Sequence, residues 1–141
     1  MVEESDLPPD YSPGINEPYM GPRQLTYFRR KLNRWRAELI QEIQNAREQI
    51  RDDGDREVGD DVDRANREAH QSIDLRTRDR YRKLIAKIDA ALARIDDGSY
   101  GFCLETGEPI GIERLEARPV ATLSVGAQER HELRERQMAK R

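Results

Sequence analysis

Apolar residues recur at intervals of three and four from residue 23 onward, and this spacing predicts a long amphipathic helix. The stripe runs for about four heptads, longer than in most globular helices, with no glycine or proline before Gly54. Its members are Leu25, Phe28, Leu32, Trp35, Leu39, Ile43, Ala46 and Ile50.

A second stripe predicts a second helix that starts near Asp61 and ends at Asp97. Gly98 follows, the residue type most often found just past a helix end. The connection, about residues 52–63, is short and rich in glycine and aspartate, so residues 23–97 are predicted to pair as an antiparallel coiled-coil hairpin. Small residues should line its seam toward the tip, and bulky ones should line the open end. The members of this second stripe are Val62, Ala65, Ala69, Leu84, Ile88, Ala91 and Ile95.

The segments on either side of the hairpin have a different character. Residues 1–22 hold five of the seven prolines and five acids but no base, which predicts a mostly extended or disordered lead-in, with Tyr19 and Met20 docked on the rest of the protein. Glycines and alternating apolar residues after position 98 predict tight turns and short strands. A polar helix from about Val125 to Met138 completes a small globular region over 98–141. The predicted fold is therefore mainly α.

Composition narrows the class of protein. Charged residues make up 38% of the 141 residues and hydrophobic residues 35%, and no apolar run approaches the length that a membrane span needs. The single cysteine rules out an intramolecular disulfide, and the acidic N-terminus has no signal-peptide pattern, so we expect a cytoplasmic protein. The net charge of −3 conceals a basic hairpin and an acidic connection that carries one base and seven acids over 52–63.

The acidic connection is the first candidate site. Its spacing fails the test for a calcium loop that starts at Asp53, because the sixth position is Val58 and the twelfth is Arg64. Two interpretations remain: an acid-rich turn that caps the second helix, or an acidic tip that reaches into a basic or metal-bearing cavity of a partner.

A second candidate site has the spacing of a C-x2-C…C-x2-C zinc module, but a cysteine stands at only one of its four positions. The four positions are Cys103, Thr106, Ser124 and Ala127. Threonine, serine and alanine supply neither thiolate nor imidazole, so we predict no bound zinc and no other cofactor. No nucleophile–base pair or phosphate-binding loop stands out, and the sequence does not predict an enzyme.

The residues Asp60-Asp-Val-Asp63-Arg-Ala65 resemble the D-x-x-D-x-A motif at the hairpin tip of the DksA family of bacterial RNA polymerase-binding transcription factors. Three further stretches are similar to the same family, namely Tyr27–Leu32 with Trp35, Leu75–Ile85 and Gly111–Pro119. The resemblance implies a coiled-coil hairpin with a zinc-finger-like globular region, here of the metal-free variety.

The resemblance also implies a function. Members insert the hairpin tip into the secondary channel of RNA polymerase and destabilise open promoter complexes, often with the alarmone ppGpp in the stringent response. This lowers ribosomal RNA synthesis and aids some biosynthetic promoters. The tip residues would be Asp60, Asp63 and Ala65, and Arg80 matches a position of polymerase contact. Members form a ppGpp site jointly with the polymerase, and its basic residues match Lys87 and Arg118, whereas a third basic position is Gln128 here.

Several alternatives stay open at this point. A generic coiled-coil adaptor would dock a partner helix along its flank and would tolerate Asp63→Asn. A zinc-finger-like DNA binder needs a strongly basic globular region, but residues 98–128 carry two bases and four acids. A cleavage factor that chelates metal through its tip acids would share the polymerase channel. We expect a monomer that contacts RNA polymerase and contacts neither DNA nor a membrane.

Overall fold

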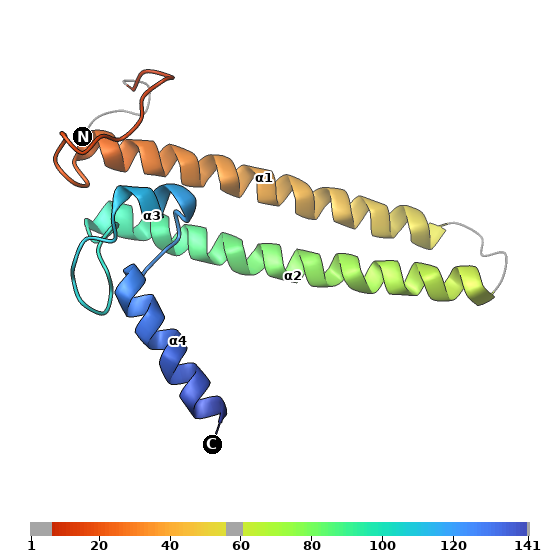
Figure 1. The fold of residues 1–141 in the computed structure, drawn as a ribbon. Coiled ribbons are helices and arrows are strands. Elements are labelled where there is room, and N and C mark those ends of the chain that lie inside the picture. Colours follow the sequence, from red (N-terminus) through yellow and green to blue (C-terminus); the bar gives the residue numbers. More distant parts are fainter. Residues whose placement is uncertain (1–6, 56–60, 141) are drawn as a thin grey trace. The chain divides into compact units, whose positions relative to one another are not determined.

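The computed structural model describes residues 7–55 and 61–140, and for residues 49–55 and 61–62 it describes the backbone alone. Its helices are α1 (Pro22–Asp55), α2 (Asp61–Asp97), α3 (Ile112–Ala117) and α4 (Val125–Ala139) (Figure 1). They form two compact units, which we call the hairpin unit (residues 33–88) and the globular unit (the described part of residues 1–32 and 89–141). The mainly helical fold is thus confirmed. No helix in the described part of the chain has the length and apolar character to cross a membrane.

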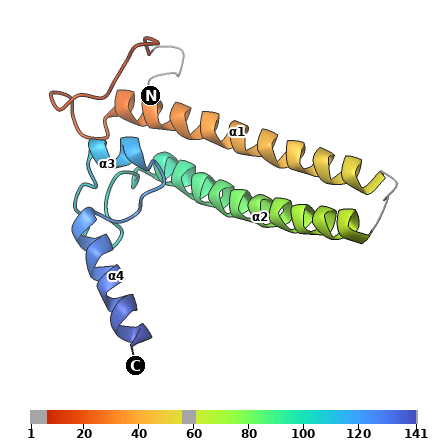
Figure 2. The same ribbon diagram turned by 45° about the vertical axis from the view of Figure 1, so that its right-hand side comes forward.

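The hairpin unit pairs parts of α1 and α2, which run antiparallel and side by side in both views (Figures 1 and 2). Leu39 of α1 and Ile88 of α2 are buried, and Trp35, Ile43 and Leu84 are half-buried. The stripe that predicted α1 therefore faces inward, as its period requires.

The inner face of α2 differs from the prediction in its first half. Its half-buried positions recur at steps of four and three residues and are mostly polar: Arg67, Gln71, Asp74, Arg78 and Tyr81, with Thr77 half-buried beside Arg78. Ala65 and Ala69, which were predicted to line the seam, are exposed, and Ile73 is 56% exposed. The reason is the helical period. Steps of three and four residues from the buried Ile88 toward the start of α2 reach these polar residues, whereas Ala65 and Ala69 lie on another face of the helix.

The globular unit has the apolar core. Phe28 and Leu32 of α1 are fully buried. So are Ala91 of α2, Leu115 of α3, and Tyr100, which lies between these two helices. The Phe28 and Tyr100 rings lie 5.7 Å apart between centroids. Ile110 and Val120 are buried as well, whereas Phe102, Ile112 and Leu123 are half-buried.

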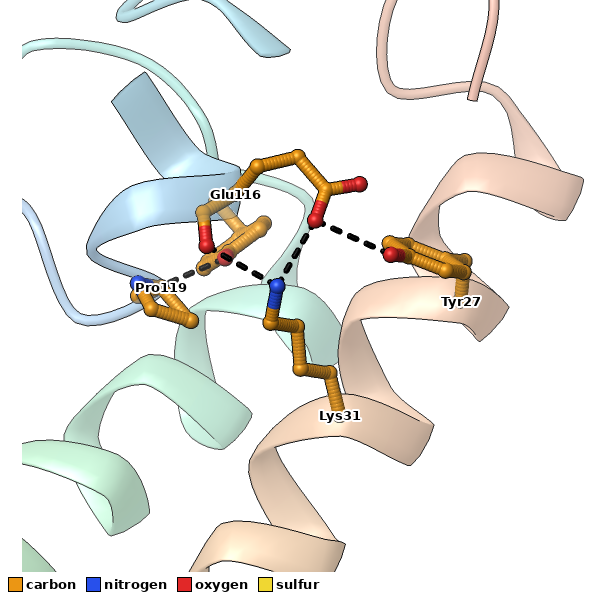
Figure 3. A network of polar contacts seen from close by, with 5 residues as sticks. Tyr27, Lys31, Glu116 and Pro119 are labelled. Carbon is orange, nitrogen blue, oxygen red and sulfur yellow. Dashed lines mark hydrogen bonds and ion pairs between the residues drawn. The ribbon is translucent and has the colours of Figure 1, made fainter. Parts of the chain in front are cut away.

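A polar network attaches α3 to α1 (Figure 3). The Lys31 ammonium donates to the Glu116 carboxylate at 2.7 Å and to the Glu116 carbonyl at 2.9 Å. The Tyr27 hydroxyl donates to the same carboxylate at 2.9 Å, and the buried Tyr100 hydroxyl donates to the Pro119 carbonyl at 2.8 Å. Side chains from α1 thus fix the end of α3, and Tyr100, which follows α2, fixes the turn after α3.

The turns after α2 follow the prediction in part. Gly98 has φ +87°, and the Arg94 carbonyl accepts from the N–H groups of Ser99 and Tyr100, which ends the helix at the predicted residue. In place of short strands, the described residues show an isolated antiparallel bridge between Phe102 and Pro109. α3 was not predicted, because six residues are too few to show a helical period.

The lead-in is non-helical, as its prolines predict, but residues 7–21 are packed on the globular unit. Leu7 and Met20 are buried. The Tyr11 ring contacts the Tyr27 ring edge-on at 5.9 Å, and the Arg23 guanidinium lies 4.8 Å from the Tyr11 centroid. The docking of Tyr19 and Met20 is confirmed, and it extends to most of the lead-in.

Candidate functional site

The start of α2 presents two of the three predicted tip residues to solvent. Asp63 is the third residue of α2 and Ala65 the fifth, and both side chains are exposed. The first N–H groups of a helix have no partner within it, so a carboxylate at this position is electrostatically favoured. Asp60 lies outside the described residues. The site therefore offers an acid next to a small side chain that leaves room for a partner.

An exposed basic stripe follows on the same helix. Its residues are separated by four, three and four positions, which places them on one face of α2. Two of them, Arg80 and Lys87, were singled out by the resemblance, and the other two could have been found from the spacing alone. The Arg80 guanidinium carbon lies 5.6 Å from the centroid of the Tyr81 ring. The stripe consists of Arg76, Arg80, Lys83 and Lys87.

Arg118 belongs to the globular unit, whereas Lys87 belongs to the hairpin unit. Arg118 follows α3, where its backbone N–H donates to the Arg114 carbonyl at 2.8 Å. Its exposed side chain lines a cavity of about 950 Å³ together with Ile15 and Glu17. Gln128 lies in the first turn of α4, and its amide donates to Glu132 at 3.0 Å. The amide can donate to an anion but carries no charge.

The four positions with zinc-module spacing all lie in the globular unit. Cys103 is 3% exposed and Ala127 is fully buried. The Ser124 hydroxyl accepts from the Ala127 N–H at 3.3 Å, which caps α4, and the Thr106 hydroxyl accepts from the Glu108 N–H at 3.3 Å. Both hydroxyls are thus already engaged in the turns to which they belong.

The Cys103 thiol is strongly polarised by its surroundings. Burial alone would raise its pKa, but hydrogen bonds from the Thr106 hydroxyl and from backbone N–H groups of Ser124, Thr106 and Glu105 outweigh burial and lower it to about 6. The sulfur is therefore satisfied by hydrogen bonds within the protein.

This donor set does not fit zinc. Tetrahedral zinc in a structural site needs four thiolate or imidazole ligands, and these positions supply one. Among the described residues no group of three or more His, Cys, Asp or Glu side chains could hold a metal ion.

Fold and site together define a class: proteins with an antiparallel helical hairpin, an exposed acid near the start of its second helix, and a small unit with four positions at zinc-module spacing. Two family models match the chain, "DnaK suppressor protein DksA, N-terminal domain" over residues 24–95 and "Prokaryotic dksA/traR C4-type zinc finger" over residues 98–133. The chain belongs to the DksA family. The second model describes a four-cysteine finger, whereas this chain has one cysteine.

Individual relatives cover nearly the whole chain. The RNA polymerase-binding transcription factor DksA of Caulobacter vibrioides is 53% identical over 136 residues, which is 96% of this chain and 92% of the relative. The protein of the same name from Escherichia coli K12 is 43% identical over 92% of this chain and 85% of its own length. The solved structure of transcription factor DksA2 from Pseudomonas aeruginosa matches with a TM-score of 0.78 and 46% identity, covering 84% of this chain and 90% of that one.

Proposed function

We propose that this protein binds RNA polymerase directly and regulates transcription initiation without catalysing a reaction. The observation that carries the proposal is an exposed acid at the start of α2 in a chain of the DksA family. The name of the Caulobacter relative, RNA polymerase-binding transcription factor DksA, supports the choice of partner.

In the proposed mechanism, the hairpin tip enters the secondary channel and places Asp60 and Asp63 near the catalytic centre. That centre handles nucleotides and magnesium ions, so a carboxylate there competes for or repositions cationic groups, and open promoter complexes become less stable. Ala65 leaves the helix surface small where it meets the channel wall. The protein would act as a cytoplasmic monomer, and it would contact neither DNA nor a membrane.

The basic stripe on α2 is proposed to contact the polymerase through Arg80. An exposed row of four cations favours an acidic protein surface, and such complementarity raises association rates and fixes orientation. Lys87 and Arg118 are proposed to contact ppGpp at an interface shared with the polymerase. Because Gln128 is neutral, the response to ppGpp should be weaker than with a third cation in its place.

The globular unit is proposed to function without zinc, since Cys103 is its one potential metal-binding thiolate. Purified protein should then contain far less than one zinc per chain by elemental analysis. One equivalent of zinc would contradict the proposal.

The test of the proposed function is multi-round transcription from a ribosomal RNA promoter with purified polymerase, with and without ppGpp. The protein should lower transcript yield, and Asp63→Asn should abolish the effect while leaving polymerase binding intact. Asp10→Asn, the same change at an exposed residue of the lead-in, is the matched control and should behave as wild type.

Two outcomes would point elsewhere. No effect on initiation in either condition would refute the proposal. Full inhibition by Asp63→Asn would favour the alternative, a coiled-coil adaptor that binds along its flank.

A further inference from the structure

The globular unit matches the model of a four-cysteine zinc finger but has one cysteine, so interactions other than zinc ligation must hold its turns. In a metal-bound finger the ion joins turns that are distant in sequence, and its removal unfolds the domain. The middle of segment 98–111, residues 104–109, is exposed, whereas Tyr100, Cys103 and Ile110 nearer its ends are buried. The question is what closes this segment.

One side chain of the lead-in bridges its two ends. The Tyr19 hydroxyl donates to the Gly101 carbonyl at 2.6 Å and accepts from the Gly111 N–H at 2.9 Å. These two backbone groups are ten residues apart and flank the bridge between Phe102 and Pro109. The single hydroxyl therefore joins the backbone just before the bridge to the backbone just after it.

The Tyr19 ring is itself held in place. It packs edge-on against the Phe102 ring, with centroids 5.6 Å apart. Burial raises the pKa of the Tyr19 hydroxyl above its ordinary value even though the Gly111 N–H lowers it, so the hydroxyl keeps the proton that it donates to Gly101.

Met20 and Gln24 fix the backbone next to Tyr19. The Met20 N–H donates to the Gln24 side-chain oxygen at 2.8 Å, and the Gln24 amide donates to the Gly14 carbonyl at 3.2 Å. Met20 has φ +54°, and its side chain covers Gly101 so closely that a Cβ there would lie 2.6 Å from the Met20 Cγ. The lead-in therefore packs closely against segment 101–111 at Gly101.

We propose that Tyr19 is a non-metal clamp that closes segment 101–111 and lets the globular unit keep its fold without zinc. Tyr19 lies outside both family-model matches, which begin at residues 24 and 98, so the clamp comes from a part of the chain that neither model describes. The clamp adds to hydrogen bonds within the segment itself, where the Ile110 N–H donates to the Gly101 carbonyl and the Cys103 N–H donates to the Glu108 carbonyl, both at 2.8 Å. Two contacts from outside the segment complete the closure: the Leu104 N–H donates to the Thr122 carbonyl at 2.9 Å, and Arg134 pairs with Glu105 at 2.9 Å. The inference does not depend on the proposed function.

Hydrogen exchange read by mass spectrometry on the full chain tests the clamp. Tyr19→Phe keeps the ring but removes the hydroxyl, so amides over 101–111 should exchange about tenfold faster, the Gly111 N–H most of all. Tyr11→Phe is the matched control: the Tyr11 hydroxyl donates to Glu17 within the lead-in, and its loss should leave 101–111 unchanged. Amides of the hairpin unit serve as the internal reference for correct folding.

A rescue experiment separates closure of the segment from general damage. The changes Thr106→Cys, Ser124→Cys and Ala127→Cys would supply four thiolates, and elemental analysis would establish one zinc per chain. In that background zinc should restore the protection that Tyr19→Phe removes. Wild-type exchange rates in Tyr19→Phe would overturn the proposal, and so would bound zinc that leaves segment 101–111 unprotected.

Discussion

The Tyr100 hydroxyl offers a sharp test of how the globular unit is held together. Tyr100 is fully buried, and its hydroxyl donates to the Pro119 carbonyl at 2.8 Å. Burial is the main cause of the raised pKa of this hydroxyl, which keeps it protonated and able to donate at neutral pH. Tyr100→Phe removes the hydrogen bond and keeps the ring beside Phe28.

The expected cost follows from the geometry. Loss of one buried hydrogen bond, with a carbonyl deprived of its donor, costs about 1–2 kcal/mol. For a chain of this size that lowers Tm by about 3–6 °C. Tyr100→Ala also removes the ring and should cost about 3–5 kcal/mol, so comparing the two variants separates the hydroxyl from the packing.

Thermal unfolding followed by circular dichroism, with urea titrations as a second measure, would give both values. Tyr81→Phe is the matched control, because Tyr81 is half-buried in the hairpin unit and contacts Arg80 through its ring, which phenylalanine retains. It should change Tm by less than about 1 °C. If Tyr100→Phe lies within the same range, the Pro119 hydrogen bond contributes nothing and the reasoning fails.

Three further predictions concern charge and thiol chemistry. Arg78 has a buried Nε atom without a hydrogen-bond partner, so Arg78→Met should leave Tm unchanged or raise it, whereas a lower Tm in the melting assay would contradict this. Hydrogen bonds from Tyr11 and Ser99 lower the pKa values of Glu17 and Asp97, so their stabilisation is present at neutral pH and is lost as pH falls below the ordinary values of 4.5 for Glu17 and 3.8 for Asp97. Tm measured against pH should show this loss, and Asp97→Asn should flatten the curve; an equally steep curve would refute the assignment. Peroxide should leave promoter inhibition unchanged in the transcription assay, because the lone cysteine is buried and has no second cysteine in the chain to pair with; a loss of inhibition that a thiol reductant reverses would show the opposite.

How much the sequence predicts depends on which interactions set each element. The end of α2 was predictable because local chemistry sets it: Gly98 adopts a positive φ, and the Asp97 carboxylate accepts from the Ser99 N–H at 2.9 Å. The end of α1 was not, since α1 continues to Asp55, past the predicted start of the connection at residue 52. The stripe of α1 was predictable because its inward positions are apolar. Both signals are local in the chain.

The features that escaped prediction depend on distant residues or on polar burial. The packing of the lead-in rests on Tyr19, which bonds to residues 82 and 92 positions away. The inner face of α2 is polar from Arg67 to Tyr81, and a search for apolar residues leads instead to the exposed Ala65 and Ala69. A contact between distant segments leaves no periodic signal, and a polar residue at an inward position looks like a surface residue in the sequence.

The low apolar content of the chain is distributed unevenly between its two units, and the distribution suits the proposed function. Of the buried apolar residues in the described part, Leu39 and Ile88 lie in the hairpin unit and all others in the globular unit. The hairpin unit therefore gains little from burial per residue, and charged side chains occupy both its exposed and its half-buried faces. Such a unit can carry acids and bases that contact a partner with little loss of folding stability, because few of its residues are buried in a core. The globular unit, where the core is concentrated, supplies the stability and carries the clamp, so a change at Asp63 should alter function without unfolding the protein.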